Sequence, residues 1–191
     1  MFAIFAAAAL SVAPGAATAD TLVATAEDAC VPVLTRTLRW PGSGQQPKED
    51  QLLARLGLTR GVPREFYDKV KQIDPRLNSL SRAILASRES GDGAFAFVLG
   101  GVDPNCRLLV YKTADRAALA KGIGAKLAAR GWKEVPAPAT KTPKRVFVRR
   151  LQSGWIVMAQ LAMPGAATPI GPMLLVDAFQ PGTKVPPEFG I

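Results

Sequence analysis

Short runs of apolar residues, separated by turn residues, recur through the middle and C-terminal parts of the chain, a pattern typical of β-strands. Residues 94–99 and 107–113 carry branched and aromatic side chains, and residues 145–151 and 155–161 form a second such pair around a Gln-Ser-Gly turn. Residues 173–179 (MLLVDAF) predict a further strand. We therefore expect an antiparallel sheet built from hairpins.

Helical spacing lies between the two pairs of strands. Leu119, Ile123 and Leu127 recur every four residues and form a narrow apolar stripe. Thr113 is the expected cap of this helix, which would run to residue 130. The pattern predicts an α+β protein with a β-β-α-β-β core, in which one helix packs on the antiparallel sheet.

Two glycines inside the predicted helix need a reason. Gly122 and Gly124 each cost about 1 kcal/mol relative to alanine in a helix interior. Close approach of the helix to the sheet would explain why glycine is kept at both positions.

The N-terminal part of the chain, residues 20–79, is read as a helical lead-in. One helix is expected to end near Val31 or to be divided in two, because Pro32 interrupts its apolar stripe. Residues 47–56 and 63–73 each begin with a proline and carry an acidic residue in the first turn, which indicates two further helices.

The mature chain, residues 20–191, is expected to form a single domain. Its sheet-rich core would span residues 80–180 and begin with the ambiguous segment 80–88, which fits a strand or a helix and is taken as a strand. Residues 133–144 are rich in lysine, proline and alanine and are interpreted as a linker. Residues 181–191 would form an extended tail.

The first 19 residues predict a signal peptide. Residues 2–12 are an apolar run, and Ala17-Thr18-Ala19 offers the small-x-small pattern of a cleavage site before Asp20. The usual Lys or Arg before the apolar run is missing. An uncleaved membrane anchor, the alternative, needs about 20 apolar residues. We expect export of residues 20–191 to the periplasm or the exterior, with no transmembrane segment after cleavage.

The chain has two cysteines, Cys30 and Cys106. In an oxidising compartment an isolated pair most often forms one disulfide, which here would join the helical lead-in to the sheet. Closing the loop between the two cysteines would contribute about 4–5 kcal/mol to the free energy of unfolding in the chain-entropy description. Two buried free thiols are the alternative.

The net charge of +9 is unevenly distributed. Residues 20–90 hold eleven basic and nine acidic residues, whereas residues 91–191 hold thirteen basic and six acidic ones. A basic excess favours anionic partners. The expected partner is an anionic envelope component or an acidic protein, and nucleic acid is not favoured.

A basic run provides the candidate anion-binding residues. On a strand, Arg145 and Arg149 would share one face with Phe147, whereas Arg150 would lie on the other. The alternative interpretation is a solvated edge strand whose charges prevent aggregation. The candidate residues are Lys141, Lys144, Arg145, Arg149 and Arg150.

Two local features receive structural interpretations. Adjacent Glu27 and Asp28 are interpreted as a helix-start feature rather than a pair of metal ligands. Trp132 and Trp155 each follow a glycine at the end of a predicted element, and they are interpreted as core aromatics rather than platforms for sugar binding.

Composition excludes several reaction classes. The chain contains no histidine, which rules out a Ser-His-Asp triad and removes the usual partner of a catalytic cysteine. Nucleotide-binding glycine loops and calcium loops are missing, so we expect neither cofactor nor metal. The sequence thus predicts an exported, non-catalytic envelope protein that binds an anionic partner through its basic C-terminal half.

A histidine-free hydrolase or transferase remains the alternative function. It would use a carboxylate pair such as Asp92 and Asp103, or a serine paired with a lysine. No serine lies in a GxSxG or SxxK motif; the candidates are Ser79, Ser81, Ser87, Ser90 and Ser153.

Overall fold

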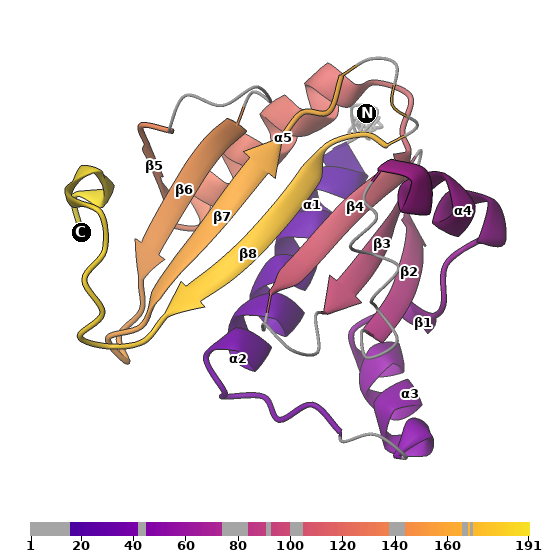
Figure 1. Ribbon diagram of the computed structural model, residues 1–191, viewed down its shortest axis with the longest axis horizontal. Helices are drawn as coiled ribbons and strands as arrows, with labels where there is room; N and C mark the ends of the chain where they lie inside the picture. Colours follow the sequence, from indigo (N-terminus) through magenta and orange to yellow (C-terminus); the bar gives the residue numbers. More distant parts are fainter. Residues whose placement is uncertain are drawn as a thin grey trace, which may run out of the picture.

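The chain folds as an antiparallel sheet with helices packed against it, which confirms the predicted α+β class (Figure 1). The architecture is that of a computed structural model, which describes residues 16–41, 45–73, 84–90, 93–99, 105–137, 144–165, 168 and 170–191. Residues 80–83 of the ambiguous segment lie outside the described residues, and the remainder of that segment is a strand, as expected.

Two meanders build the eight-stranded sheet of the described residues, one from each edge. The first comprises β1 (Thr59–Arg60), β2 (Ile84–Ser90), β3 (Gly93–Leu99) and β4 (Cys106–Lys112). The second comprises β5 (Lys133–Val135), β6 (Lys144–Arg150), β7 (Ile156–Ala162) and β8 (Met173–Phe179). They meet where β4 pairs with β8, so the strand order is β1-β2-β3-β4-β8-β7-β6-β5.

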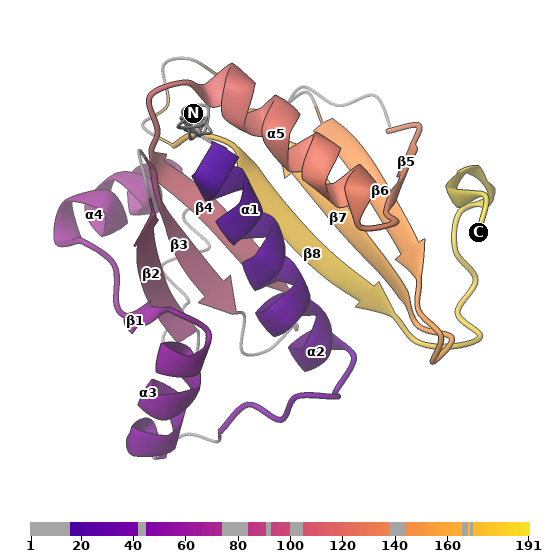
Figure 2. The same cartoon turned by 180° about the vertical axis from the view of Figure 1, so that it is seen from behind.

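Two helices cover the same face of the sheet, where the sequence predicted one (Figure 2). These are α1 (Ala16–Thr25), which belongs to the N-terminal part, and α5 (Arg116–Ala129). Leu22 of α1 and Leu119 of α5 are fully buried in a core that also takes Phe147 of β6 and Leu174 of β8. The helical lead-in is therefore an integral part of the core.

The expected break near Pro32 is a change of helix type rather than an end. After α1 the chain continues through a π-helical turn, η1 (Ala26–Cys30), and a short helix, α2 (Val31–Leu34). The Val31 amide donates to the Ala26 carbonyl, five residues back. A wider turn suits this position, because proline lacks an amide hydrogen and its ring crowds the preceding turn.

Helix α5 differs from the prediction in its cap and in the reason for its glycines. Asp115, not Thr113, is the N-cap, and its Oδ1 accepts a hydrogen bond from the Ala118 amide at 2.9 Å. A Cβ on Gly122 would lie 3.2 Å from Cβ of Ala19, so this glycine allows α1 to approach α5. A Cβ on Gly124 would instead collide with the Arg145 guanidinium.

The two predicted helices α3 (Gln46–Arg55) and α4 (Arg64–Ile73) form as expected. Helix α4 lies on the side of the sheet opposite α1 and α5 (Figures 1 and 2), where Phe66 packs on Tyr111 with ring centroids 4.5 Å apart. None of the helices in the described part of the chain has the length and hydropathy needed to cross a membrane.

Two segments predicted to be irregular contain secondary structure. The expected linker of residues 133–144 includes edge strand β5, whose Val135 is buried against Val146 of β6. The expected extended tail contains a 3₁₀ turn, η3 (Pro187–Phe189), and buries Phe189 at 6.3 Å from the Phe179 ring. Burial of one large apolar side chain thus fixes the tail to the sheet.

A disulfide joins Cys30 and Cys106, as predicted, with a Cα–Cα distance of 5.5 Å. Both cysteines are fully buried, and the bond ties η1 to the first residue of β4. A protein disulfide indicates an oxidising, non-cytoplasmic environment. Residues 1–15 lie outside the described residues, and α1 begins at Ala16, upstream of the expected cleavage site. The signal peptide therefore stays a prediction.

Candidate functional site

The predicted anion-binding residues do not form one patch. Strand β6 directs Arg145 and Arg149 toward the helix-covered side with Phe147, and directs Lys144 and Arg150 to the opposite face with Val146 and Val148. This separation of Arg145 and Arg149 from Arg150 is the one the sequence predicted. The remaining candidate, Lys141, lies outside the described residues.

Arg145 forms an ion pair within the fold. Its Nε and Nη2 donate to the two carboxylate oxygens of Glu134, both at 2.7 Å, and its guanidinium lies 5.1 Å from the Phe147 ring centroid. The hydrogen bond from Arg145 lowers the pKa of the Glu134 carboxyl. Lys144 Nζ lies 3.5 Å from Oε1 of Gln160. Arg145 therefore belongs to an intramolecular ion pair.

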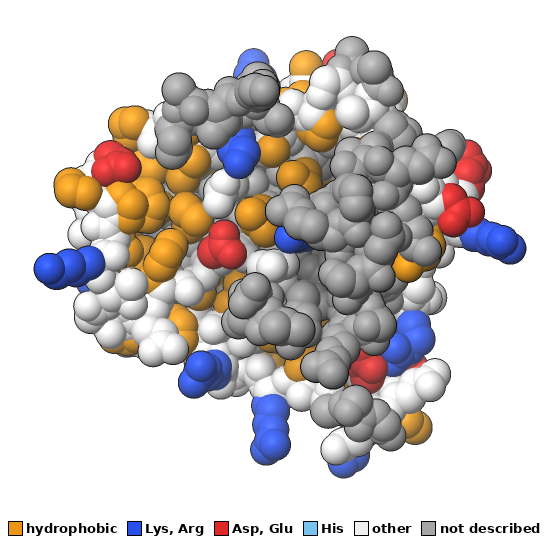
Figure 3. Space-filling view, viewed as in Figure 1, with side chains coloured by type: hydrophobic (Ala, Val, Ile, Leu, Met, Phe, Trp, Pro, Cys, Tyr) orange, Lys and Arg blue, Asp and Glu red, His pale blue; other side chains and the backbone are white. Residues whose placement is uncertain are grey.

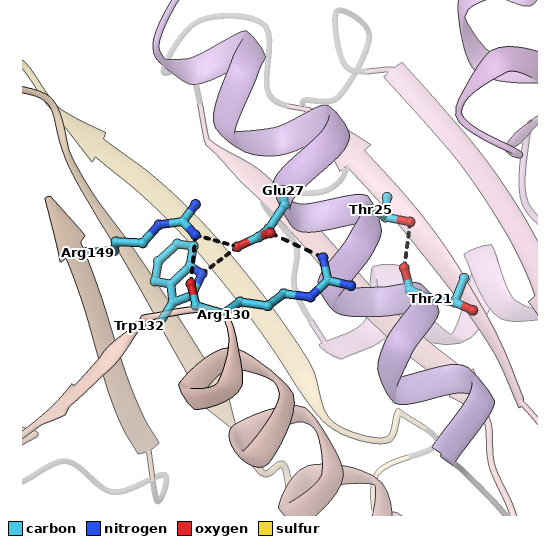
Figure 4. Close-up of polar contacts among 6 residues, drawn as sticks. All are labelled: Thr21, Thr25, Glu27, Arg130, Trp132 and Arg149. Atoms are coloured by element: carbon cyan, nitrogen blue, oxygen red, sulfur yellow. Dashed lines mark hydrogen bonds and ion pairs between the residues drawn. The ribbon is translucent and has the colours of Figure 1, made fainter. Parts of the chain in front are cut away.

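Arg149 is held by a second acid, Glu27 on η1 (Figure 4). Its Nη1 donates to Glu27 Oε1 at 2.8 Å and to the Arg130 carbonyl at 2.9 Å. The guanidinium also lies 4.9 Å from the ring centroid of Trp132. These contacts connect β6, the end of α5 and the π-helical turn.

Glu27 is the centre of this group, which we call the Glu27 cluster: Glu27, Arg130, Trp132 and Arg149. The Glu27 carboxylate also accepts from Nε1 of Trp132 at 2.8 Å and from Nη1 of Arg130 at 3.1 Å. Only 17% of the Glu27 side chain is exposed. Trp132 is buried, as predicted. Glu27 lies in the first turn of η1, which continues α1 without a break, so it marks the start of the π-helical turn rather than of a separate helix.

A cleft of about 470 Å³ opens beside the same turn. It lies between η1 and the end of α1, the C-terminal end of α3, and β2. Its lining combines small apolar groups with three charged side chains: Ala24, Thr25, Asp28, Ala54, Arg55, Leu56, Gly57 and Arg88. This volume lies within the range of about 300–1,000 Å³ that is usual for small-molecule sites.

The end of α3 explains why Arg88 reaches the cleft. Gly57 has a φ of +68°, and the Leu58 amide donates to the Leu53 carbonyl at 2.8 Å, which closes the helix and reverses the chain. The chain then enters β1, where Thr59 pairs with Ser87 of β2. Arg88, the next residue, lies against Gly57, because a Cβ there would stand 2.7 Å from its Nη1.

The charged side chains of the cleft, unlike Arg145 and Arg149 of β6, have no partner of opposite charge among the described residues. Among the described residues, no carboxylate lies within ion-pair distance of Arg55 or Arg88, and no cation lies within ion-pair distance of the Asp28 carboxylate. By contrast, Arg60 pairs with Glu49 and Asp50 in a neighbouring part of the molecule. Two guanidinium groups and one carboxylate therefore remain available to a ligand.

The helix-free face of the sheet has a further half-buried acid. Figure 3 shows apolar side chains gathered on this face, which includes Met158 and Leu175. Burial raises the pKa of the Asp177 carboxyl on β8, and the charge of Arg107 and a hydrogen bond with Gln160 oppose this rise. The burial of Asp177 thus disfavours its ionised form more than Arg107 and Gln160 favour it.

The described residues of the alternative, catalytic hypothesis are not brought together. Ser87 lies on β2 and Ser153 in the turn before β7, at sites that share no described contact, and only the backbone of Ser90 is described. Asp92, Asp103, Ser79 and Ser81 lie outside the described residues. Within the part of the chain that the structure describes, no group of three or more His, Cys, Asp or Glu residues could hold a metal ion.

The comparisons with known proteins leave the site to be interpreted from its own geometry. No family model, curated protein or solved structure matches the chain.

Proposed function

We propose that the protein is a non-catalytic binding protein of an oxidising, extracytoplasmic compartment, and that it binds a small ligand through an acidic group held by Arg55 and Arg88. One observation carries the proposal: both guanidinium groups line one cleft and have no carboxylate partner among the described residues. Arg145 and Arg149 are neutralised within the fold.

The chemistry of arginine suits this role. A guanidinium presents a planar fork of donors that matches a carboxylate or phosphate, and it stays charged at all physiological pH values. Hydrogen bonds that involve a charged group contribute about 1.5–3 kcal/mol each. Arg88 is half-buried against Gly57, which restricts its side chain before a ligand arrives.

Binding is favoured over acid–base catalysis by the other lining residues. Among the described residues that line the cleft, Asp28 is the single carboxylate, whereas hydrolysis by paired carboxylates needs two. The Thr25 hydroxyl donates to the Thr21 carbonyl at 2.8 Å and is buried (Figure 4). Its proton is therefore held by a backbone carbonyl, which is not a base that could activate the hydroxyl as a nucleophile.

Export to the periplasm or the exterior is part of this proposal. The buried disulfide supports an oxidising compartment, and the apolar run with its small-x-small pattern supports a signal peptide. Removal of residues 1–19 would leave Leu22 and Val23 in the core but would remove Ala19, which lies against Gly122 of α5.

Isothermal titration with inorganic phosphate and with N-acetyl-Ala-Ala, a simple carboxylate, tests the function. We expect Arg55→Gln with Arg88→Gln to weaken binding at least tenfold, and Arg150→Gln, an exposed arginine on β6, to leave it unchanged. Binding should weaken as salt rises. If neither of these compounds nor the dipeptide Ala-Ala binds, or if the double variant binds as the wild type does, the proposal is wrong. A loss confined to Arg150→Gln would place the site on β6.

A further inference from the structure

The charges in the cleft point to a more specific ligand than an anion. We propose that the cleft binds a zwitterion, a molecule with both a carboxylate and an ammonium group, as in a free amino acid or a short peptide with free termini. This inference rests on the proposed function, because it assigns the acidic group of the ligand to Arg55 and Arg88 and adds a partner for Asp28.

Asp28 carries the argument. It lines the same cleft as the two arginines, and no ion pair joins it to either of them. A ligand with acidic groups alone would meet the arginines but be repelled by Asp28. A purely cationic ligand would meet Asp28 but be repelled by two guanidinium groups. Only a ligand that carries both signs satisfies all three side chains.

The position of Asp28 is fixed before binding. Its neighbours on the π-helical turn are anchored elsewhere: Glu27 binds Arg149 and Trp132, and Cys30 is bonded to Cys106. The turn therefore presents Asp28 to the cleft from a braced backbone. Preorganisation of this kind lowers the entropic cost of binding, and π-helical turns occur frequently at functional sites.

The remainder of the lining fits the body of such a ligand. Ala24, Ala54 and Leu56 supply short apolar surfaces beside the charged groups. They would contact the hydrocarbon part of an amino acid or dipeptide, whereas a compact inorganic anion would leave them unused. The combination of a few polar groups with apolar walls is usual for small-molecule sites.

The test compares four probes that differ in charge: Ala-Ala, N-acetyl-Ala-Ala (carboxylate only), Ala-Ala-amide (ammonium only) and alanine. In isothermal titration we expect wild-type protein to bind Ala-Ala at least tenfold more tightly than either blocked form. Asp28→Asn should abolish this preference for Ala-Ala over N-acetyl-Ala-Ala. Glu188→Gln, which alters an exposed carboxylate of the tail, should preserve it.

The outcomes separate this inference from the function on which it rests. Equal or tighter binding of N-acetyl-Ala-Ala that still requires Arg55 and Arg88 would overturn the zwitterion and leave the anion-binding function intact. If the Arg55→Gln/Arg88→Gln variant binds Ala-Ala and N-acetyl-Ala-Ala as tightly as wild type does, both the zwitterion proposal and the anion-binding function are overturned. Alanine binding as tightly as Ala-Ala would support a free amino acid, and weaker binding of alanine would support a peptide.

Discussion

Arg149 on β6 donates to Glu27 on the π-helical turn at 2.8 Å, although 122 residues separate them in the sequence. Both side chains are largely enclosed, with exposed fractions of 24% and 17%. The contact fastens the far half of the sheet to the turn that also holds Asp28 and one end of the disulfide. The Glu27 cluster therefore stabilises the fold and braces one wall of the cleft.

Glu27→Gln is expected to destabilise the protein by about 1–3 kcal/mol, because Arg149 then keeps a half-buried charge without a counter-charge. The glutamine oxygen can still accept from Trp132, which isolates the effect of charge. Urea unfolding would measure the change. Glu188→Gln, in the exposed tail, should alter stability by less than about 0.5 kcal/mol. Equal effects of the two substitutions would contradict a structural role for the cluster.

The paired replacement Cys30→Ala with Cys106→Ala should cost about 4–5 kcal/mol of unfolding free energy. The bond closes a loop with a sequence separation of 76 residues, and its loss frees the unfolded chain. Urea unfolding with and without a reductant measures this cost in wild type. The double variant should be insensitive to reductant, and an equally insensitive wild-type protein would show that the bond does not form.

The two glycines of α5 should respond differently to alanine. Alanine at position 124 meets the guanidinium end of Arg145, which can move aside at the expense of its nearly half-exposed ion pair with Glu134. Such a pair contributes less than about 1 kcal/mol, so the gain of about 1 kcal/mol in helix propensity should offset the displacement. In a chain that retains Ala19, alanine at position 122 meets Cβ of this buried residue at 3.2 Å, where the helices cannot easily separate. Gly124→Ala should therefore have the higher Tm of the two, and the reverse order would refute the packing of α1 on α5.

Asp177→Asn is expected to raise the Tm at pH 7. Burial raises the pKa of this carboxyl in the folded state, so the folded protein binds the proton more tightly than the unfolded chain. The resulting stability is present below the unfolded value of 3.8 and is lost as the pH rises through the folded pKa. The advantage of Asn should accordingly shrink toward acidic pH.

Glu134→Gln supplies a control of opposite sign. Arg145 lowers the pKa of Glu134, so its contribution is present above the unfolded value of 4.5 and is lost as the pH falls through the folded pKa. This variant should be slightly less stable than wild type at pH 7, since the pair is nearly half exposed. A rise in Tm for both variants at pH 7 would indicate a general charge effect.

Local patterns predicted the longer elements well. Residues 173–179 form β8 with the expected bounds, and β6 and β7 are displaced by one residue at their ends. Strands β1 and β5 were missed, because two or three residues are too few to show an alternation. Helix α1, the second helix of the core, was interpreted as part of a lead-in. An apolar stripe indicates that one face of a helix is buried, but it does not indicate which surface that face packs against.

The candidate site depends on contacts that no local pattern contains. The sequence predicted that Arg145 and Arg149 share a face, but not that this face meets Glu134 and Glu27. Arg55, Arg88 and Asp28 come together from three elements because Gly57 turns the chain into β1. The disulfide was predictable because the chain offers only two cysteines.

The order of the sheet has a consequence for synthesis. Strand β8 is the last to leave the ribosome, yet it lies in the middle, between β4 and β7. Until it emerges, the growing chain holds two separate half-sheets, each with an inner edge whose backbone groups are open to other chains. Insertion of β8 therefore joins the two half-sheets, and any nascent chain that stops before residue 173 exposes both inner edges to aggregation.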